Sequence, residues 1–178
     1  MRIFSAVQSD ITDRAARDVG AVRSREERRV LDGFGFAVAV TAGAGAAGDE
    51  VNVGLRLQAA GTSKIVVTRA YVSVSVSVLT FAYMNTGILA APGVTALGAG
   101  SNRLASSTQD TQAEAITQVG VGITPAGSAV WNSTGLTALT PTRIEGPWIV
   151  DVALDALTFN FVDLGAGTAR VAFHWYEE

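Results

Sequence analysis

Few residues of this chain have the types and spacing that acid–base or nucleophilic chemistry needs. Among 178 residues there is one histidine, His174, and no cysteine. The absence of cysteine excludes a thiolate metal site and a cysteine nucleophile, and a lone histidine excludes a His-rich zinc site. His174 lies between Phe173 and Trp175 in an alternating run, which predicts a surface or interface position. No Gly-x-Ser-x-Gly elbow supplies a serine nucleophile.

Paired carboxylates are the other arrangement that could catalyse a reaction. A glycan hydrolase on a sandwich scaffold would need two convergent acids near aromatic residues. Asp151 and Asp155 are close in sequence, but we expect one on a strand and the other at its end, and a surface calcium site there or at Asp163 is an alternative. The acids of the body loops are few: Asp110, Glu145 and Asp163, with Glu114 close by. We predict no catalytic residue, no metal, no cofactor and no enzyme activity.

Three further patterns could bind ligands. The Gly-rich segments 42–48 and 93–100 lack the Gly-Lys-Ser/Thr ending of a phosphate loop. Asn132-Ser-Thr matches a glycosylation sequon, which we attribute to chance because residues 1–10 do not resemble a signal peptide. Three tryptophans could stack on sugars, but packing is favoured because two of them stand in apolar alternation: Trp131, Trp148 and Trp175.

The density of charged residues falls sharply after Asp32-Gly33, which marks a boundary between two parts of the chain. Seven of the 13 basic residues and six acids lie in residues 1–32, so this segment is mixed in sign. We predict an N-terminal arm over 1–32, partly helical or disordered until it docks, with helix candidates at 11–18 and 24–31; a solvated arm is the alternative. The net charge of −3 disfavours direct nucleic-acid binding, and no run of about 18 apolar residues predicts a membrane span.

Residues 33–178 form the second predicted unit, an all-β domain. Apolar residues alternate with small or polar ones in five segments: 34–41, 51–57, 64–84, 157–161 and 170–176. The segment 64–84 is too long for one ordinary strand, so a bend or a hairpin is expected within it. A strand is predicted over 113–123, with a short helix over 109–116 as the alternative. About eight strands without crossover helices predict an antiparallel jelly roll or β-sandwich.

Two stretches carry a resemblance to a known family. Lys64-Ile-Val-Val-Thr-Arg-Ala-Tyr-Val-Ser-Val-Ser and the closing segment from Leu157 to Glu178 resemble the small jelly-roll virion proteins of tailed phages, of the head-decoration or cement type. The resemblance implies a homotrimer on the outer face of the phage head, made in the bacterial cytoplasm. Its partners would be the major capsid protein and other copies of itself, with no direct nucleic-acid or membrane contact. The Arg-rich arm departs from the family's compact pattern.

The arm and several aromatic residues are the predicted contacts with the capsid or with neighbouring subunits. These residues are Arg14, Arg17, Arg23, Arg25, Arg28, Arg29, Phe34, Phe36, Trp148 and Trp175. Our hypothesis is that residues 1–32 dock on a neighbouring subunit.

Two non-enzymatic alternatives remain open. A head spike, fibre or tail protein that binds host glycans would place exposed aromatic residues in loops 85–112 or 124–142, where Trp131 is the one tryptophan. A cytokine-like trimer of the host is disfavoured because no signal peptide is expected and the chain has no cysteine.

Overall fold

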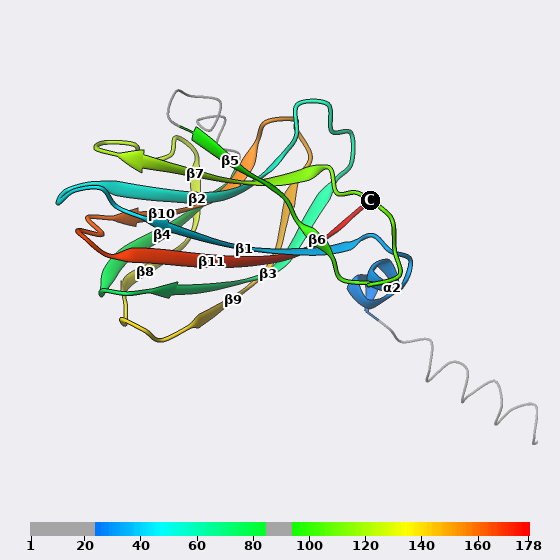
Figure 1. The fold of residues 1–178 in the computed structure, drawn as a ribbon, viewed down its shortest axis with the longest axis horizontal. Helices are drawn as coiled ribbons and strands as arrows, with labels where there is room; N and C mark the ends of the chain where they lie inside the picture. Colours follow the sequence, from blue (N-terminus) through cyan, green and yellow to red (C-terminus); the bar gives the residue numbers. More distant parts are fainter. Residues whose placement is uncertain (1–23, 85–93) are drawn as a thin grey trace, which may run out of the picture.

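Two antiparallel sheets packed face to face make up the body of the protein (Figure 1). The structure is a computed structural model that describes residues 24–84 and 94–178. It confirms the predicted all-β antiparallel sandwich, with more strands than the predicted eight. Sheet A has five strands in the order β6 (Ser101–Asn102), β1 (Gly35–Gly43), β11 (Thr168–Glu177), β3 (Ile65–Val74) and β9 (Thr142–Val150). Sheet B has six in the order β5 (Val94–Ala99), β7 (Ala113–Gly120), β2 (Glu50–Leu57), β10 (Ala156–Val162), β4 (Val78–Met84) and β8 (Ser128–Leu136).

The long strands pair as a set of nested partners. β4 pairs with β8, β3 with β9, β2 with β10 and β1 with β11, so the first four strands meet the last four in reverse order. Within this set successive strands change sheets, except that β4 and β8 lie side by side in sheet B. The group β5–β7 is inserted between them in sequence: β7 and β5 extend sheet B beyond β2, and β6 adds a short edge strand to sheet A.

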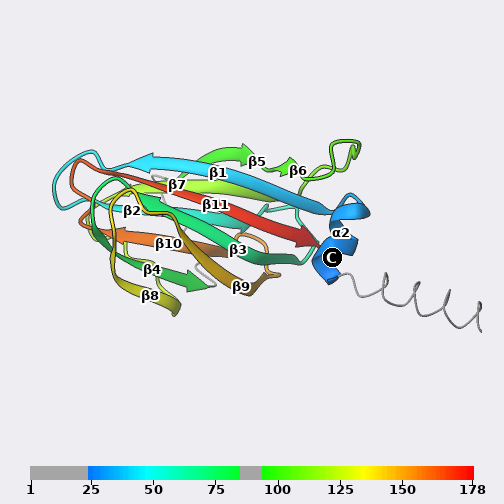
Figure 2. The ribbon, with the colours of Figure 1, turned by 90° about the horizontal axis from the view of Figure 1, so that it is seen from below.

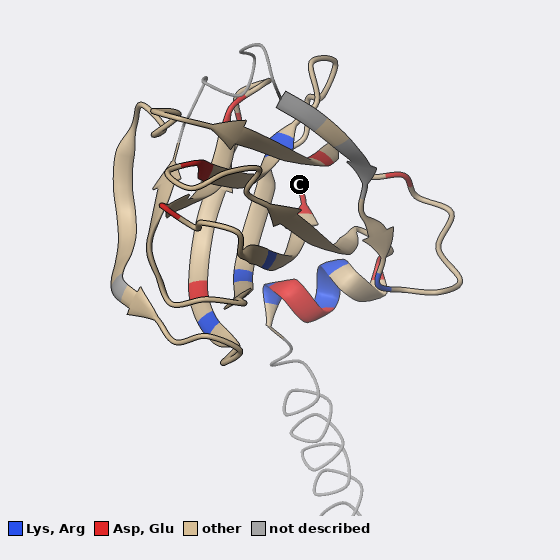
Figure 3. Cartoon of the chain, turned by 60° about the vertical axis from the view of Figure 1, so that its left-hand side comes forward, with Lys and Arg blue, Asp and Glu red and all other residues tan. Residues whose placement is uncertain are grey.

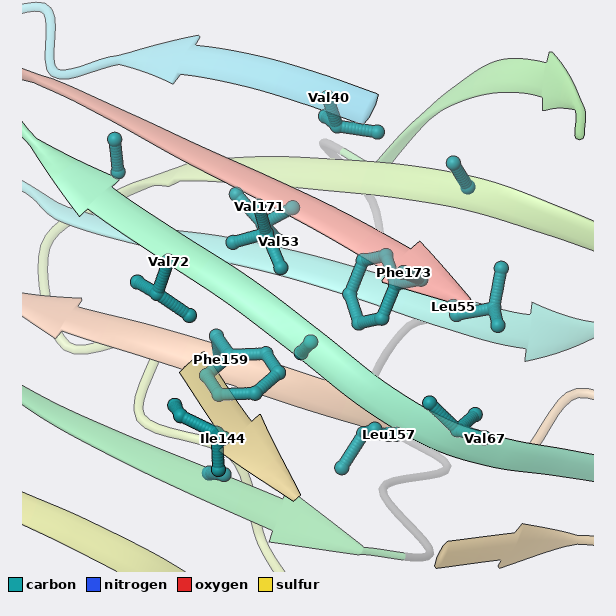
Figure 4. Close-up of a cluster of buried hydrophobic side chains, with 14 of the residues drawn as sticks. Val40, Val53, Leu55, Val67, Val72, Ile144, Leu157, Phe159, Val171 and Phe173 are labelled. Carbon is teal, nitrogen blue, oxygen red and sulfur yellow. The ribbon is translucent and has the colours of Figure 1, made fainter. Parts of the chain in front are cut away.

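The core lies between the inner faces of the two sheets (Figure 4). Period-two alternation turns Val171, Phe173 and Trp175 of β11 inward, where all three are fully buried. The ring of Phe173 packs against Phe159 of sheet B with centroids 5.9 Å apart. Each such aromatic side chain stabilises the fold by roughly 1.5–3 kcal/mol through the apolar surface that it removes from water.

The long alternating segment 64–84 bends and forms no hairpin. β3 belongs to sheet A and β4 to sheet B, and residues 75–77 carry the chain from one to the other. Val74 and Val78 on either side are buried, whereas Val76 in the bend is 41% exposed. Alternation therefore predicted both strands. Because it continues through residues 75–77, it does not show where the chain bends.

Residues 94–102 also pass between sheets, along one edge of the sandwich. β5 pairs with β7 in sheet B and β6 pairs with β1 in sheet A, with Gly100 between them. A Cβ atom at Gly100 would lie 2.1 Å from Cη2 of Trp175, so this position requires glycine. The close approach lets the chain cover the indole at the edge of the core.

Helix α2 (Arg25–Leu31) lies at one end of the sandwich beside the C-terminus, as both ribbon views show (Figures 1 and 2). Its start is a capping box: Ser24 Oγ accepts from the Glu27 N–H, and the Glu27 carboxylate accepts from the Ser24 N–H. Gly33, with φ +85°, follows its end. The predicted helix over 24–31 is confirmed, and the candidate at 11–18 lies outside the described residues.

The strand predicted over 113–123 is confirmed as β7, which ends at Gly120 and is paired on both sides by β2 and β5. The alternative helix over 109–116 is therefore not formed. Asp151, which we expected on a strand, lies just after the end of β9 at Val150. Residues 151–154 turn the chain towards β10, and Leu154 has φ 68°.

Candidate functional site

The outer face of sheet A carries the features that are not explained by packing within the chain. Register places the small side chains of Ala39 and Ala172 opposite each other across β1 and β11, and Ala37 opposite His174. We call this outer surface the contact face; it comprises Ala37, Ala39, Thr41, Arg69, Tyr71, Ser73, Arg143, Glu145, Arg170, Ala172 and His174. Three hollows border it, one at the end covered by α2 and two at the opposite end.

A carboxylate between two guanidinium groups occupies the α2 end of the contact face. Glu26 of α2 accepts a hydrogen bond from Arg69 Nη2 of β3 at 2.9 Å and another from Arg103 Nη1, in the turn after β6. The three side chains are between 19% and 24% exposed. Burial alone would raise the pKa of Glu26, but the hydrogen bond from Arg103 and the charges of Arg69 and Arg103 outweigh it, so the pKa lies below 4.5.

His174 lies half-buried next to this charge cluster, on the outward side of β11 as alternation predicted. Its ring meets Tyr71 edge-on with centroids 5.6 Å apart, and its Nδ1 has no hydrogen-bond partner within the described chain. Burial lowers the pKa of His174 below 6.5, and the nearby Arg103 and Arg69 charges lower it further. The α2 end of the contact face therefore favours the neutral form of the His174 imidazole.

Helix α2 is held to the body mainly by polar contacts, and none of its residues is buried. Arg29 Nε donates to the Glu177 carbonyl at 2.8 Å, and its guanidinium lies 4.4 Å from the centre of the Phe34 ring. Arg25 pairs with Glu178 at 2.8 Å. Figure 3 shows the basic and acidic residues of α2 at this end of the body. An open hollow of about 570 Å³ lies among α2, Arg69 and Arg103.

The opposite end of the contact face is a trough beside an exposed leucine. Two adjoining hollows, of about 270 and 230 Å³, share Ser73, Pro141 and Arg170. We call them together the trough; Tyr71 and Ala172 line one end, and Thr41 and Leu139 the other. Leu139, in the loop between β8 and β9, is 80% exposed.

The structure corrects two of the predicted contact residues. Phe36 and Trp175 are 1% and 0% exposed, and their rings stack in the core with centroids 5.8 Å apart. Side chains so buried pack within their own chain and leave no surface for a partner. Phe34 and Trp148 are half-buried, the first beneath Arg29 and the second against the core.

The predicted contact arginines are divided by the structure. Arg25 and Arg29 contact the C-terminal residues of their own chain, and Arg28 is exposed without an ion pair to any described residue. Arg14, Arg17 and Arg23 lie outside the described residues. The part of the arm that the structure describes is therefore docked on its own body, and docking of the arm on a neighbour stays a prediction.

The acids considered for chemistry do not converge. Asp151 and Asp155 lie in the turn after β9, while Asp163 accepts from the Gly48 N–H at 3.2 Å between β10 and β11. Within residues 24–84 and 94–178, no three Asp, Glu or His side chains gather closely enough to hold a metal ion. Glu145 instead pairs with Arg143 on the contact face.

The outer face of sheet B differs because its polar side chains are buried. Asn160, Asn52 and Gln118 stand in one row across β10, β2 and β7, joined by hydrogen bonds of 2.9 and 3.2 Å. Asn52 also donates to the Ile123 carbonyl at 2.8 Å, so the segment after β7 lies over this row. The Nδ2 groups of Asn52 and Asn160 donate within the chain, while the buried Asn160 Oδ1 has no hydrogen-bond partner among the described residues.

Sequence reasoning missed the cluster of Glu26, Arg69 and Arg103, and it missed Leu139. The three charged residues are far apart in the sequence, and no local spacing marks them as partners. Leu139 carried no distinguishing signal in the sequence, because single apolar residues are common in exposed loops.

Comparisons with known proteins give no family for this chain. A scan against protein-family models, a search of curated proteins and a search of solved structures each return no match. No helix in the described ranges has the length and apolar composition needed to span a bilayer. The contact face and the resemblance in the sequence are therefore the features of this chain that bear on its function.

Proposed function

We propose that this protein is a structural virion subunit that decorates the outer face of a phage head. Its expected assembly is a homotrimer bound to the major capsid protein. The proposal combines the resemblance of residues 64–75 and 157–178 to head-decoration proteins with the character of the contact face. Such a subunit works through broad complementary contact and many copies, and it needs no catalytic pocket.

The strand order supports a jelly roll as the finer description of the sandwich. With β5–β7 set aside, the nested pairs leave β1, β11, β3 and β9 in one sheet and β2, β10, β4 and β8 in the other. A long antiparallel hairpin of four strand pairs, rolled up on itself, gives this order, and eight strands in two sheets are typical of jelly rolls. The group β5–β7 would then be an insertion between the fourth and fifth strands of the roll.

The contact face is the observation that carries the proposal. Among the polar residues of this face, the small apolar side chains of Ala37, Ala39 and Ala172 point outward beside the trough. Small side chains let another protein surface approach closely, and the open hollows do not enclose a small molecule. The face therefore fits a flat protein partner better than a substrate.

The edges of the sheets are less suited to association. β9 carries Arg143, Glu145 and Pro147, and charge and proline both disfavour strand addition. β8 shows two shifts of register against β4, and such bulges also disfavour strand addition. At β8 and β9 the sheet edges are thus poorly suited to strand addition.

Binding to phage heads tests the proposal. Purified protein is added to heads that lack it, and co-sedimentation is measured for the wild type, for Ala39→Arg on the contact face, and for Asn132→Arg on the outer side of β8. Wild type and Asn132→Arg should bind, and Ala39→Arg should lose most binding because the added side chain holds the surfaces apart. Failure of the wild type to bind would sink the proposal, and equal binding by both variants would exclude the contact face.

Glycan binding by a spike or tail protein is the second candidate, and one observation favours it. Phe81 and Tyr83 of β4 lie together on the outer side of sheet B, with ring centroids 6.0 Å apart, and the exposed Asn132 lies opposite Phe81. Aromatic rings beside an amide group can stack on and hydrogen-bond a sugar. A glycan array with wild type and Phe81→Ala distinguishes the two candidates, since the decoration proposal expects no glycan signal from either protein.

A further inference from the structure

Leu139 combines two features that normally count against a residue at a surface. Its backbone has φ 60°, a left-handed conformation that disfavours a leucine side chain. Its side chain is 80% exposed, the largest such fraction among the exposed large apolar residues of the described chain. The conformation is held in place, because the Leu139 N–H donates to the Val74 carbonyl at 2.7 Å and the Thr140 N–H donates to the Thr137 carbonyl. Strain and exposure held together in one place point to a binding role.

The trough next to Leu139 has room for such a side chain. Its larger hollow, of about 270 Å³, is lined by apolar and small polar groups that include Thr41, Ser73 and Pro141. Leu139 forms part of its rim and does not fill it. A projecting apolar residue and a hollow of suitable size therefore lie side by side on one surface.

We propose that Leu139 of one copy inserts into the trough of a second copy of this chain. A surface that carries both a projection and a matching hollow is self-complementary, because each copy can give one and receive one. The small residues Ala39 and Ala172 on the same face allow two copies to approach closely. The inference rests on the proposed function for its setting, a subunit that associates with itself, and goes beyond it by naming the anchor residue and its acceptor.

The charged residues of the contact face are also compatible with a second copy of this chain as the partner. Arg170 lines both hollows of the trough and makes no ion pair within the described chain. The Glu145 side chain on the same face is 58% exposed. A second copy presents acidic as well as basic groups on the same face, although Glu145 also pairs with Arg143 of its own chain, whereas an apolar partner would leave Arg170 unpaired.

Light scattering over a range of protein concentrations gives the first test. The wild type should have the mass of an oligomer, and Leu139→Gly should have the mass of a monomer while still unfolding cooperatively, because glycine adopts a positive φ without strain. Leu154→Gly, at the other leucine with positive φ, and Val121→Ser, at another exposed apolar residue, are matched controls that should keep the wild-type mass. A monomeric wild type, or an oligomeric Leu139→Gly, would overturn the inference.

Disulfide trapping then identifies where Leu139 binds. The chain has no cysteine, so Leu139→Cys and Ser73→Cys can be made in separate preparations and mixed under oxidising conditions. A covalent product of the two different variants is expected, and Val121→Cys mixed with Ser73→Cys should give none. If Leu139→Gly abolishes the oligomer but this cross-link does not form, Leu139 binds somewhere other than the trough, and the trough is overturned as its acceptor. Oligomers that fail to bind phage heads would count against the proposed function and leave this inference standing.

Discussion

Glu26 Oε1 lies 2.9 Å from Arg69 Nη2, and this contact ties the N-terminal helix to the middle of sheet A. A seven-residue helix is not stable alone, so α2 depends on such contacts with the body. Arg103 shares the same carboxylate oxygen, which makes Glu26 the link between the arm, β3 and the turn after β6.

Replacing Glu26 should therefore release α2 without unfolding the body. Glu26→Gln removes the charge that two arginines share, and the expected loss is about 1 kcal/mol, since the side chains are partly solvated. Hydrogen exchange of the amides in residues 25–31 should accelerate while exchange in β3 and β11 stays slow. Arg28→Gln, on the exposed side of the same helix, is the control and should change neither. Unchanged exchange in Glu26→Gln would show that the other contacts suffice to hold the helix.

Acidification should weaken the α2 end of the contact face in two steps. The pKa of His174 is lowered by burial and by the Arg103 and Arg69 charges, so the unfolded chain takes up this proton more readily than the folded protein. The stability that His174 gives the folded protein is fully present above pH 6.5. It is lost as the pH falls from 6.5 through the folded-state pKa of His174. The pKa of Glu26 is also lowered, so its contribution is complete above 4.5 and is lost as the pH falls from 4.5 through its own folded-state pKa.

Thermal melting followed across this pH range checks both steps. The wild type should lose stability first below 6.5 and again below 4.5. His174→Gln should lack the first step, and Glu26→Gln should lack the second. A first step that persists in His174→Gln would assign it to another group.

Gly100→Ala should loosen the edge of the core. The added methyl group would overlap the indole of Trp175, and overpacking of this kind costs about 1–3 kcal/mol. The expected result is a lower melting temperature together with altered tryptophan fluorescence. Gly135→Ala is the matched control, because nothing lies within 4 Å of a Cβ at that position. Equal melting temperatures for the two variants would contradict the role assigned to Gly100.

The buried carboxylate of Glu177 should stabilise the C-terminal strand. It is 3% exposed and accepts from the Thr111 hydroxyl and from the Gln112 N–H at 3.0 Å. Glu177→Ala leaves these donors without a partner, which costs about 1–3 kcal/mol. Chemical denaturation measures the loss, and Glu178→Ala, which removes the ion pair with the exposed Arg25, is the comparison and should cost less. A smaller loss in Glu177→Ala than in Glu178→Ala would contradict this account.

Local pattern was sufficient to predict the elements that depend on neighbouring residues. Alternation over 51–57 and 170–176 predicted β2 and β11, and the same alternation placed Phe173 and His174 on opposite faces. The helix candidate at 24–31 became α2, with a capping box at Ser24. Each of these features follows from backbone geometry over a few residues, which sequence spacing records directly.

The sequence by itself determined the fold class, because a repeated period of two allows strands and excludes helices in the body. The tertiary structure alone decided which strands pair, where residues 75–77 cross between sheets, and that Phe36 and Trp175 belong to the core. It also brought Glu26, Arg69 and Arg103 together and set Leu139 beside the trough. These contacts join residues far apart in the chain, and periodicity states which side of a strand is apolar but not which distant segment will cover it.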